Sequence, residues 1–479
     1  MRLKKVSLSN FRCFEKLSLE LHPRLTVLVG KNGAGKTAVL DGIACALSPV
    51  LNYLSSANQR LSGRGIEDGD FRVLQWPQLG GNARWGMAEI TQLEVETFDG
   101  LTWDVWRPSA TGKKPSQTTG QTELKHYLQT IADSYATEHP RLTPVIAYYG
   151  ARRGYIEVPQ RLHGAKENYG YPAAALIGAL DSQSNFREML AWFDQEEAAE
   201  LRSNKGVAPE DFVETHSLAA VRAAIKELLG GEYANPHFNK DHKFVVVRES
   251  DGAHLLVNQL SQGYQSMLSL AMDYARRLAI GNPHTQYARE QAWPDIVNEI
   301  RKLAELDSRL SPDVKPSLDI PLRSSIALSA PAIMLVDEID VHLHPSWQQR
   351  VLDDLMSTFP LTQFIVTTHS PQVLSTVKRE NIRILGPDAD GKIIAAQPLA
   401  MTYGEPSGTV LHSVMMVDPQ PPVSEKADLQ RLTELVDQGE YHSDEAKQLQ
   451  QRLQTALGLQ HPQLQRLQRS IQRQEMLKR

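Results

Sequence analysis

The first twenty residues alternate between apolar and polar side chains, which is typical of strands with one buried face. The apolar positions are Leu3, Val6, Leu8, Leu17, Leu19 and Leu21. The segment Asn10–Phe14 interrupts the alternation, so we predict two antiparallel strands joined there. Two more alternating pairs surround Asp-Gly dipeptides, which predicts β-hairpins at residues 89–106 and 244–257.

Four short runs are apolar throughout and rich in β-branched residues, which predicts buried parallel strands. They occupy residues 25–29, 144–149, 332–336 and 364–368, and residues 382–385 and 393–396 would close the same sheet. Segments with helical apolar spacing lie between them, notably residues 38–47, 267–280 and 346–357. We therefore expect an α/β fold with a mixed sheet, an antiparallel N-terminal β subdomain, a helical insertion and a helical tail.

Polar stretches separate these elements. We expect a surface loop at residues 48–78 and a polar insertion with short helices at residues 281–328. Ser217 and Ser443 are predicted to cap helices. Together these patterns divide the chain into an N-terminal lobe, a mainly helical insertion, a C-terminal lobe and a tail, at residues 1–150, 151–240, 241–418 and 419–479.

The tail is expected to begin with a proline-rich linker and to continue as three amphipathic helices. The last of these is basic, because it carries Arg466, Arg469, Arg473, Lys478 and Arg479 against a single acid, Glu475.

Composition limits the class of protein. The chain has 479 residues and a net charge of −5, so the whole molecule is not a basic nucleic-acid binder. Its two cysteines, Cys13 and Cys45, lie in apolar segments without metal-ligand spacing, so we expect buried thiols and a reducing cytoplasm. No apolar run is expected to span a membrane, and no signal peptide is expected.

The segment Gly30–Thr37 matches G-x-x-x-x-G-K-[ST] without a mismatch, between a predicted strand and a predicted helix. In that context glycines let backbone N–H groups approach phosphates, and the helix N-terminus adds a favourable dipole. Lys36 would reach the β- and γ-phosphates of a nucleotide, and the Thr37 hydroxyl would ligate Mg²⁺. The sequence thus predicts an ATP and Mg²⁺ site.

Polar residues end two of the predicted buried strands. Asp337 would anchor Mg²⁺, and Glu338 would orient and activate the attacking water. His369, which ends the other strand, could hydrogen-bond the γ-phosphate. Their order after a single phosphate loop predicts ATP hydrolysis.

This order of motifs resembles the ATP-binding-cassette (ABC) ATPases. The Walker A motif would be Gly30–Thr37, the signature Leu260–Gln265, the Walker B motif Ile333–Glu338, the D-loop residue Asp340 and the switch histidine His369. The resemblance implies that Ser261 and Gly263 act on the γ-phosphate in trans, so that ATP joins two copies. It also implies the nucleotide-binding set Asn32, Gly33, Ala34, Gly35, Lys36, Thr37 and Ala38.

Two features depart from the ABC pattern. Gln262 replaces the first glycine of the transporter signature. The Q-loop glutamine is open among Gln75, Gln78 and Gln160.

Asn10-Phe11-Arg12 resembles the RecF, SMC and OLD branch of these ATPases, and by that likeness Arg12 also approaches the nucleotide. Within the branch the chain is similar to the PtuA-like ATPases of Septu and retron anti-phage systems. The residues that carry this likeness are 147–152, 260–264 and 337–345. It implies a homodimer or larger assembly and a small HNH nuclease supplied in trans, held by the helical tail, with no nuclease site in this chain.

Alternatives remain open from the residues themselves. A RecF-like repair or structural ATPase would act at DNA, whereas a sensor would bind ATP and hydrolyse it hardly at all. Arg152 and Arg153 follow a glycine at a strand end, so they either contact phosphate or nucleic acid or form a solvated turn. His342 and His344 favour packing or a dimer contact over metal ligation.

Overall fold

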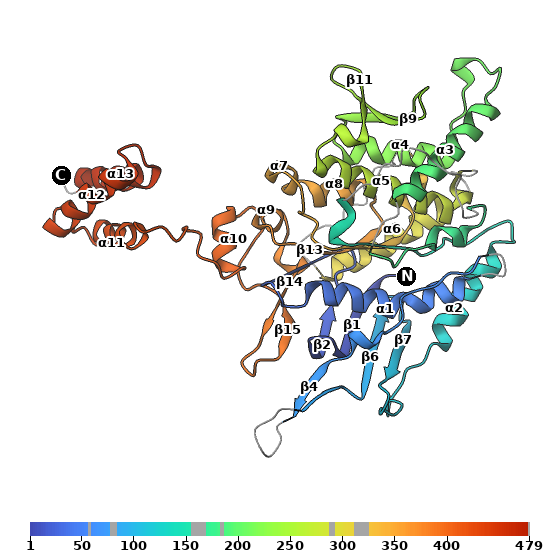
Figure 1. Cartoon of the computed structure of the whole chain (residues 1–479), viewed down its shortest axis with the longest axis horizontal. Helices are drawn as coiled ribbons and strands as arrows, with labels where there is room; N and C mark the ends of the chain where they lie inside the picture. Colours follow the sequence, from blue (N-terminus) through green and yellow to red (C-terminus); the bar gives the residue numbers. More distant parts are fainter. Residues whose placement is uncertain are drawn as a thin grey trace. The chain divides into compact units, whose positions relative to one another are not determined.

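The computed structural model describes residues 1–55, 59–76, 84–154, 169–182, 186–286, 293–310 and 325–477. The chain forms two compact units, Met1–Val410 and Leu411–Arg479 (Figure 1). Gln78 and Gln160 lie outside the described residues, as do Lys478 and Arg479. The finer division of the first unit at residues 150 and 240 stays a prediction.

A six-stranded mixed sheet forms the centre of the first unit. Its strand order is β15-β14-β3-β13-β12-β8, and only β15 runs antiparallel to its neighbour. The strands are β3 (Leu25–Gly30), β8 (Val145–Tyr149), β12 (Ala332–Val336), β13 (Thr362–Thr367), β14 (Ile382–Pro387) and β15 (Ile393–Ala396). Every residue of β8, β12 and β13 is buried, which explains their continuous apolar runs.

A separate antiparallel sheet carries the N-terminal strands, in the order β2-β1-β6-β7. These are β1 (Leu3–Phe11), β2 (Phe14–Glu20), β6 (Ile90–Thr97) and β7 (Thr102–Pro108). Leu8 lies opposite Leu17 on one side and Leu93 on the other, so the alternating apolar residues form one buried face. The predicted N-terminal strand pair and the 89–106 hairpin are confirmed.

Helix α1 (Lys36–Leu54) packs against strands of both sheets and joins their cores. The predicted loop beginning at residue 48 is wrong, because the helix continues to Leu54 through Pro49. Val50 and Leu51 are fully buried, and the Ser48 hydroxyl donates to the carbonyl of Arg64 at 2.6 Å. By length and composition α1 could cross a membrane, contrary to our expectation, but it is a core helix that is mostly buried.

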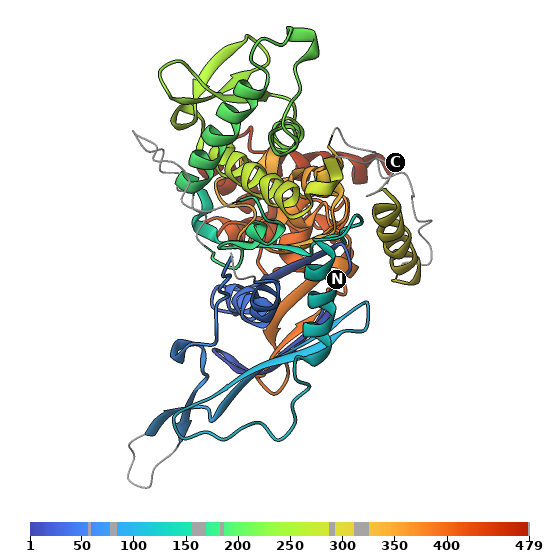
Figure 2. The same cartoon turned by 90° about the vertical axis from the view of Figure 1, so that its right-hand side faces the viewer.

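Further helices cover the other side of the six-stranded sheet, away from the antiparallel sheet, in both views of the molecule (Figures 1 and 2). They include α3 (Phe186–Ser203), α4 (His216–Leu228) and α5 (Gln262–Gly281), whereas α6 (Trp293–Leu310) packs against Leu361. Beside them lies a small sheet, β11-β10-β9, made of β9 (Tyr233–Phe238), β10 (Phe244–Arg248) and β11 (Ala253–Leu256). Trp192 and Phe193 are buried in this layer, as core residues rather than an exposed stacking platform.

The limits of several helices differ from the predicted ones. Thr215 precedes α4, and Ser217 lies inside the helix with its hydroxyl donating to Glu196, so the predicted Ser217 cap is wrong. Helix α5 begins at Gln262, five residues before the predicted start. The predicted helix at residues 346–357 is divided into α7 (Pro345–Gln348) and α8 (Val351–Thr358).

The second unit includes the end of α10 (Ser407–Ser413) and the helices α11 (Lys426–Asp437), α12 (Asp444–Leu457) and α13 (Pro462–Leu477). The apolar stripes of α11, α12 and α13 form a small core of their own around Leu432, Leu435 and Leu453. Ser443 caps α12 by accepting a hydrogen bond from the N–H of Ala446 at 3.2 Å, which confirms that prediction.

Candidate functional site

The phosphate loop connects the end of β3 to the start of α1. Gly33 and Gly35 have φ values of 83° and 92°, in the left-handed region that favours glycine. A Cβ atom on Gly35 would lie 2.6 Å from the Phe14 ring and 2.7 Å from Cys13 Sγ, so only glycine fits there. No side chain caps α1 at Gly35, so its first N–H groups are available to an anion.

Lys36 is the first residue of α1, and its side chain turns back along the loop. Its Nζ donates to the carbonyl of Gly30 at 2.9 Å and to that of Lys31 at 3.3 Å. Burial lowers the pKa of Lys36, while the nearby carboxylates Asp337, Glu338 and Asp340 oppose that shift. The ammonium group is thus held between the phosphate loop and the carboxylates that follow β12.

Thr37 and Asp337 meet across 300 residues of sequence. The Thr37 hydroxyl donates to Asp337 Oδ2 at 2.8 Å, and the Thr367 hydroxyl donates to Asp337 Oδ1 at 2.6 Å. Asp337 is 4% exposed, and its N–H donates to the carbonyl of Tyr149. The structure therefore fixes Asp337 next to the phosphate loop, by two contacts to its carboxylate and one to its backbone.

The donor set suits Mg²⁺. A hydroxyl and a carboxylate are hard oxygen ligands, and Mg²⁺ bound to nucleotides usually takes only one or two protein carboxylates. Within the described ranges, no group of three His, Cys, Asp or Glu side chains could hold a metal ion by itself. Thr37 and Asp337 thus fit an ion whose other ligands come from phosphate and water.

Glu338 has an unusual backbone conformation. Its φ is 47°, which is uncommon for a residue other than glycine, asparagine or aspartate. Its N–H donates to the Thr367 hydroxyl at 2.7 Å, while its side chain is half-buried. In the part of the chain that the structure describes, no hydrogen bond is made to the Glu338 carboxylate. This carboxylate remains available to accept a hydrogen bond from water.

His369 lies beyond the end of β13 and is linked to the segment after β12 through Asp340. The Asp340 carboxylate accepts the hydroxyl of Thr368 at 2.6 Å and the N–H of His369 at 3.2 Å. Since β12, β13 and β3 are parallel neighbours, their carboxyl ends bring Glu338, His369 and the phosphate loop to one edge of the sheet.

Ser261 and Gly263 lie at the start of α5, against the segment that follows β12. Ser261 caps α5, and its Oγ accepts the N–H of Tyr264 at 3.5 Å. A Cβ atom on Gly263 would lie 2.7 Å from the carbonyl oxygen of His342. Ser261 is exposed, whereas Gly263 is buried. Their action on a phosphate stays a prediction.

Arg12 takes part in a cluster of charges beside α1. Its guanidinium lies 2.6 Å from Asp41 and 2.9 Å from Asp70, and Arg64 also pairs with both carboxylates. Tyr148 donates its hydroxyl to Asp41 at 2.9 Å, and burial together with Asp41 raises the Tyr148 pKa. The structure thus engages Arg12 with carboxylates of the protein, and its predicted approach to the nucleotide remains a prediction.

Arg153 is a site residue whose role the sequence did not reveal. It is 3% exposed, so it is not part of a solvated turn, and its Nη1 and Nη2 donate to the carbonyls of Asp337 and Glu338. Arg152 next to it is exposed. The two arginines were indistinguishable by sequence because the turn that follows β8 decides which of them faces inward.

Two other expectations concern this region. Cys45 is buried as predicted, and burial raises its pKa to about 12, but Cys13 is exposed, because it lies in the turn between β1 and β2. Of the glutamines considered for the Q-loop, Gln75 is exposed in β4 (Val73–Trp76), which pairs with β5 (Arg84–Met87).

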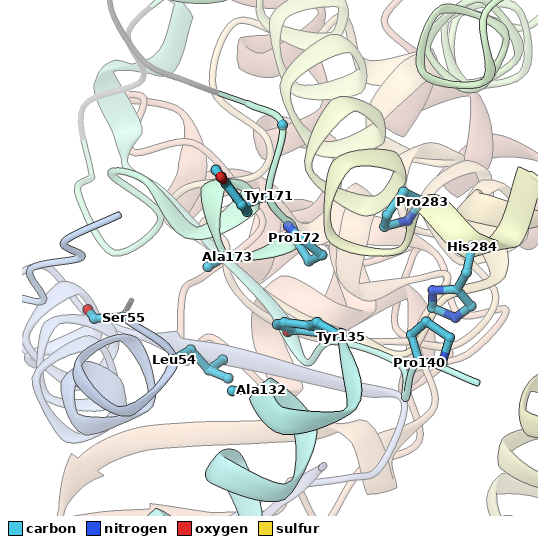
Figure 3. Close-up of a pocket in the computed structure, with 11 residues that line it drawn as sticks. Leu54, Ser55, Ala132, Tyr135, Pro140, Tyr171, Pro172, Ala173, Pro283 and His284 are labelled. Atoms are coloured by element: carbon cyan, nitrogen blue, oxygen red, sulfur yellow. The ribbon is translucent and has the colours of Figure 1, made fainter. Parts of the chain in front are cut away.

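A cavity of about 370 Å³ lies at the far end of α1, roughly 27 Å along the helix from Lys36 at about 1.5 Å per residue (Figure 3). Mostly apolar side chains line it, among them Leu54, Tyr135 and Pro172. None of the predicted nucleotide-binding residues lines this cavity, so it is separate from the site at the phosphate loop.

Comparison with known proteins gives the family of this chain. Residues 134–375 match the family described as "AAA domain, putative AbiEii toxin, Type IV TA system", and residues 5–229 match a second family described as "AAA domain". The chain is 25% identical to the retron Vc95 probable ATPase of Vibrio cholerae serotype O1 biovar El Tor, covering 86% of this chain and 78% of that protein.

Further relatives include a second retron ATPase and a Septu protein. The retron Ec83 probable ATPase of Escherichia coli is 26% identical, over 94% of this chain and 82% of its own length. The Septu protein PtuA of Bacillus thuringiensis is 35% identical over a shorter stretch, 18% of this chain and 22% of that protein.

Proposed function

Because this chain belongs to the AAA-domain family that matches residues 134–375, we propose that it binds ATP with Mg²⁺ and hydrolyses it. The observation that carries the proposal is the meeting of Thr37 with Asp337 next to Lys36. The loop N–H groups and Lys36 would bind the phosphates, and Thr37 and Asp337 would hold the ion. Mg²⁺, when bound, neutralises charge that develops on the phosphate oxygens.

Glu338 is the proposed base. Its free carboxylate lies beyond the buried strand that ends at Val336, where it orients a water molecule and accepts its proton. His369, at the adjacent strand end, is the proposed γ-phosphate contact. Ser261 and Gly263 of a second copy would complete the site, because the exposed serine and the start of α5 offer hydrogen-bond donors to an anion.

We propose further that the chain is the ATPase subunit of a bacterial anti-phage defence system, working in the cytoplasm with an HNH nuclease supplied in trans. Its similarity to two retron ATPases and to PtuA supports this role. The second unit is the proposed nuclease contact. It has its own core and exposes Leu459, Met476 and Leu477 at 70%, 76% and 79%.

Hydrolysis is tested by comparing wild type with Lys36→Ala and Glu338→Gln. We expect Lys36→Ala to lose ATP binding, and Glu338→Gln to bind ATP but stop hydrolysis and accumulate a dimer in light scattering. Equal, slow turnover in wild type and Glu338→Gln would refute the hydrolytic role and favour an ATP sensor.

The defence role is tested by purifying the tagged full chain from its own host beside a version that ends before Ser424. Mass spectrometry and a nuclease assay are applied to both. We expect a small nuclease to co-purify only with the full chain. An ATPase that co-purifies with no nuclease, and whose turnover rises with added DNA, would instead identify a RecF-like role.

A further inference from the structure

Arg153 donates hydrogen bonds to the backbone of Asp337 and Glu338. It belongs to η2 (Ala151–Gly154), the turn directly after β8. Its Nη1 donates to the carbonyl of Asp337 at 2.5 Å, and its Nη2 donates to that of Glu338 at 2.9 Å. One planar guanidinium thus fixes two consecutive peptide groups.

That backbone needs external support. A glutamate at φ 47° occupies the left-handed region, which is disfavoured by roughly 1–2 kcal/mol for a residue with a Cβ. Such a conformation persists only where the surrounding structure determines it. The contacts that hold it include the Thr367 hydroxyl, which accepts the N–H of Glu338, and two donors to the Glu338 carbonyl, Arg153 and the N–H of Val341.

The Arg153 guanidinium is charged although it is buried. Burial lowers the Arg153 pKa to about 10, and Asp337, Asp340 and Glu338 oppose the shift, so the group is protonated at neutral pH. A charged donor gives stronger hydrogen bonds than a neutral one. Because both bonds go to carbonyls, Arg153 itself occupies neither the Asp337 nor the Glu338 carboxylate.

The turn that carries Arg153 is itself held by the signature helix. Tyr149, the last residue of β8, donates its hydroxyl to the buried carboxylate of Asp273 on α5 at 2.8 Å. Helix α5 also packs against η2. Gly150 donates its N–H to the carbonyl of Ser182 at 2.9 Å. Arg153 is therefore anchored between the sheet and the helix that begins with the signature.

We propose that Arg153 is a positioning residue that sets the backbone of Asp337 and Glu338 for hydrolysis without contacting the nucleotide. This inference rests on the proposed function, in which Glu338 activates water. It predicts that loss of the Arg153 hydrogen bonds to Asp337 and Glu338 lowers kcat. ATP binding should be preserved, because the phosphate loop is unchanged.

The test compares Arg153→Lys and Arg153→Gln with Arg152→Lys, an exposed neighbour that serves as the matched control. Thermal unfolding, ATP affinity and steady-state kinetics are measured on the full chain. We expect kcat to fall roughly tenfold to a hundredfold, as for a displacement of about 1 Å at a reacting group. We expect ATP affinity to change by less than about threefold, with Arg152→Lys like wild type.

A double-mutant cycle with Glu338→Gln separates positioning from general damage. If Arg153 acts through Glu338, adding Arg153→Lys to Glu338→Gln lowers the residual turnover no further. A further loss, an unchanged kcat in both single variants, or failure of both to fold would overturn the inference. Full turnover in Glu338→Gln alone would instead refute the proposed function, whatever Arg153→Lys does.

Discussion

Alanine in place of Gly35 tests the fit between the phosphate loop and the N-terminal sheet, and Gly33→Ala is its matched control. Both glycines are left-handed, with φ values of 92° and 83°. A Cβ on Gly33 would meet nothing within 4 Å, whereas one on Gly35 would lie 2.6 Å from the Phe14 ring. The two variants therefore share backbone strain and differ in steric overlap.

The magnitudes follow from these contacts. Left-handed strain should lower the stability of both variants by roughly 1–2 kcal/mol. Overpacking should add about 1–3 kcal/mol in Gly35→Ala alone. Cys13 is exposed and can rotate away, but Phe14 is 1% exposed and belongs to the buried core. We expect Gly35→Ala to be the less stable variant by at least about 1 kcal/mol.

Urea unfolding followed by tryptophan fluorescence measures this difference. All seven tryptophans precede Leu411, so the fluorescence reports on the unit Met1–Val410. We also expect Gly35→Ala to bind a fluorescent ATP analogue more weakly than Gly33→Ala. Equal losses of stability in the two variants would refute the steric argument.

Three more predictions concern other parts of the molecule. Thr37→Val removes the hydroxyl donor to Asp337, so ATP binding should weaken roughly tenfold in Mg²⁺ and much less in EDTA, as a titration in both buffers would reveal. Burial lowers the pKa of His22 in the folded protein to about 4, with help from Arg383, whereas its pKa in the unfolded chain is about 6.5. Because the unfolded chain takes up the proton first, the folded state should lose stability as pH falls from about 6.5 towards 4. Urea unfolding at pH 7 and pH 5 should show a smaller loss in His22→Asn, and an unchanged loss would contradict the assignment. Ser443→Ala removes the cap of α12 and should destabilise the second unit by about 1 kcal/mol, leaving the tryptophan-monitored transition unchanged.

The sheet and the phosphate loop could be predicted from sequence because their causes are local. Uninterrupted apolar runs mark buried strands, and residues 30–37 carry a loop geometry that needs glycine at Gly33 and Gly35. The placement of Asp337 and Glu338 beyond a buried strand also follows from the run that precedes them.

Other features depend on contacts that the sequence does not display. The polar stretch that starts at residue 48 suggested a loop, but α1 continues because Val50 and Leu51 fill the core between the sheets. Arg152 and Arg153 are chemically identical, and only the turn after β8 buries the second. Long-range packing decided both cases.

The position of β3 in its sheet has a consequence for how the protein is made. Among the described strands, the neighbours of β3 are β13 and β14, whose residues are synthesised more than 330 positions later. At roughly 5–20 residues per second, the ribosome leaves this apolar strand without its neighbours for about 20–60 s. The Gln363 side chain, which hydrogen-bonds the N–H and the carbonyl of Leu3, joins two residues that are similarly far apart in the sequence. A chain that ends before β13 lacks the strand that lies between β3 and β12, so it cannot bring Asp337 to Thr37. A growing chain therefore needs protection from aggregation until β13 emerges.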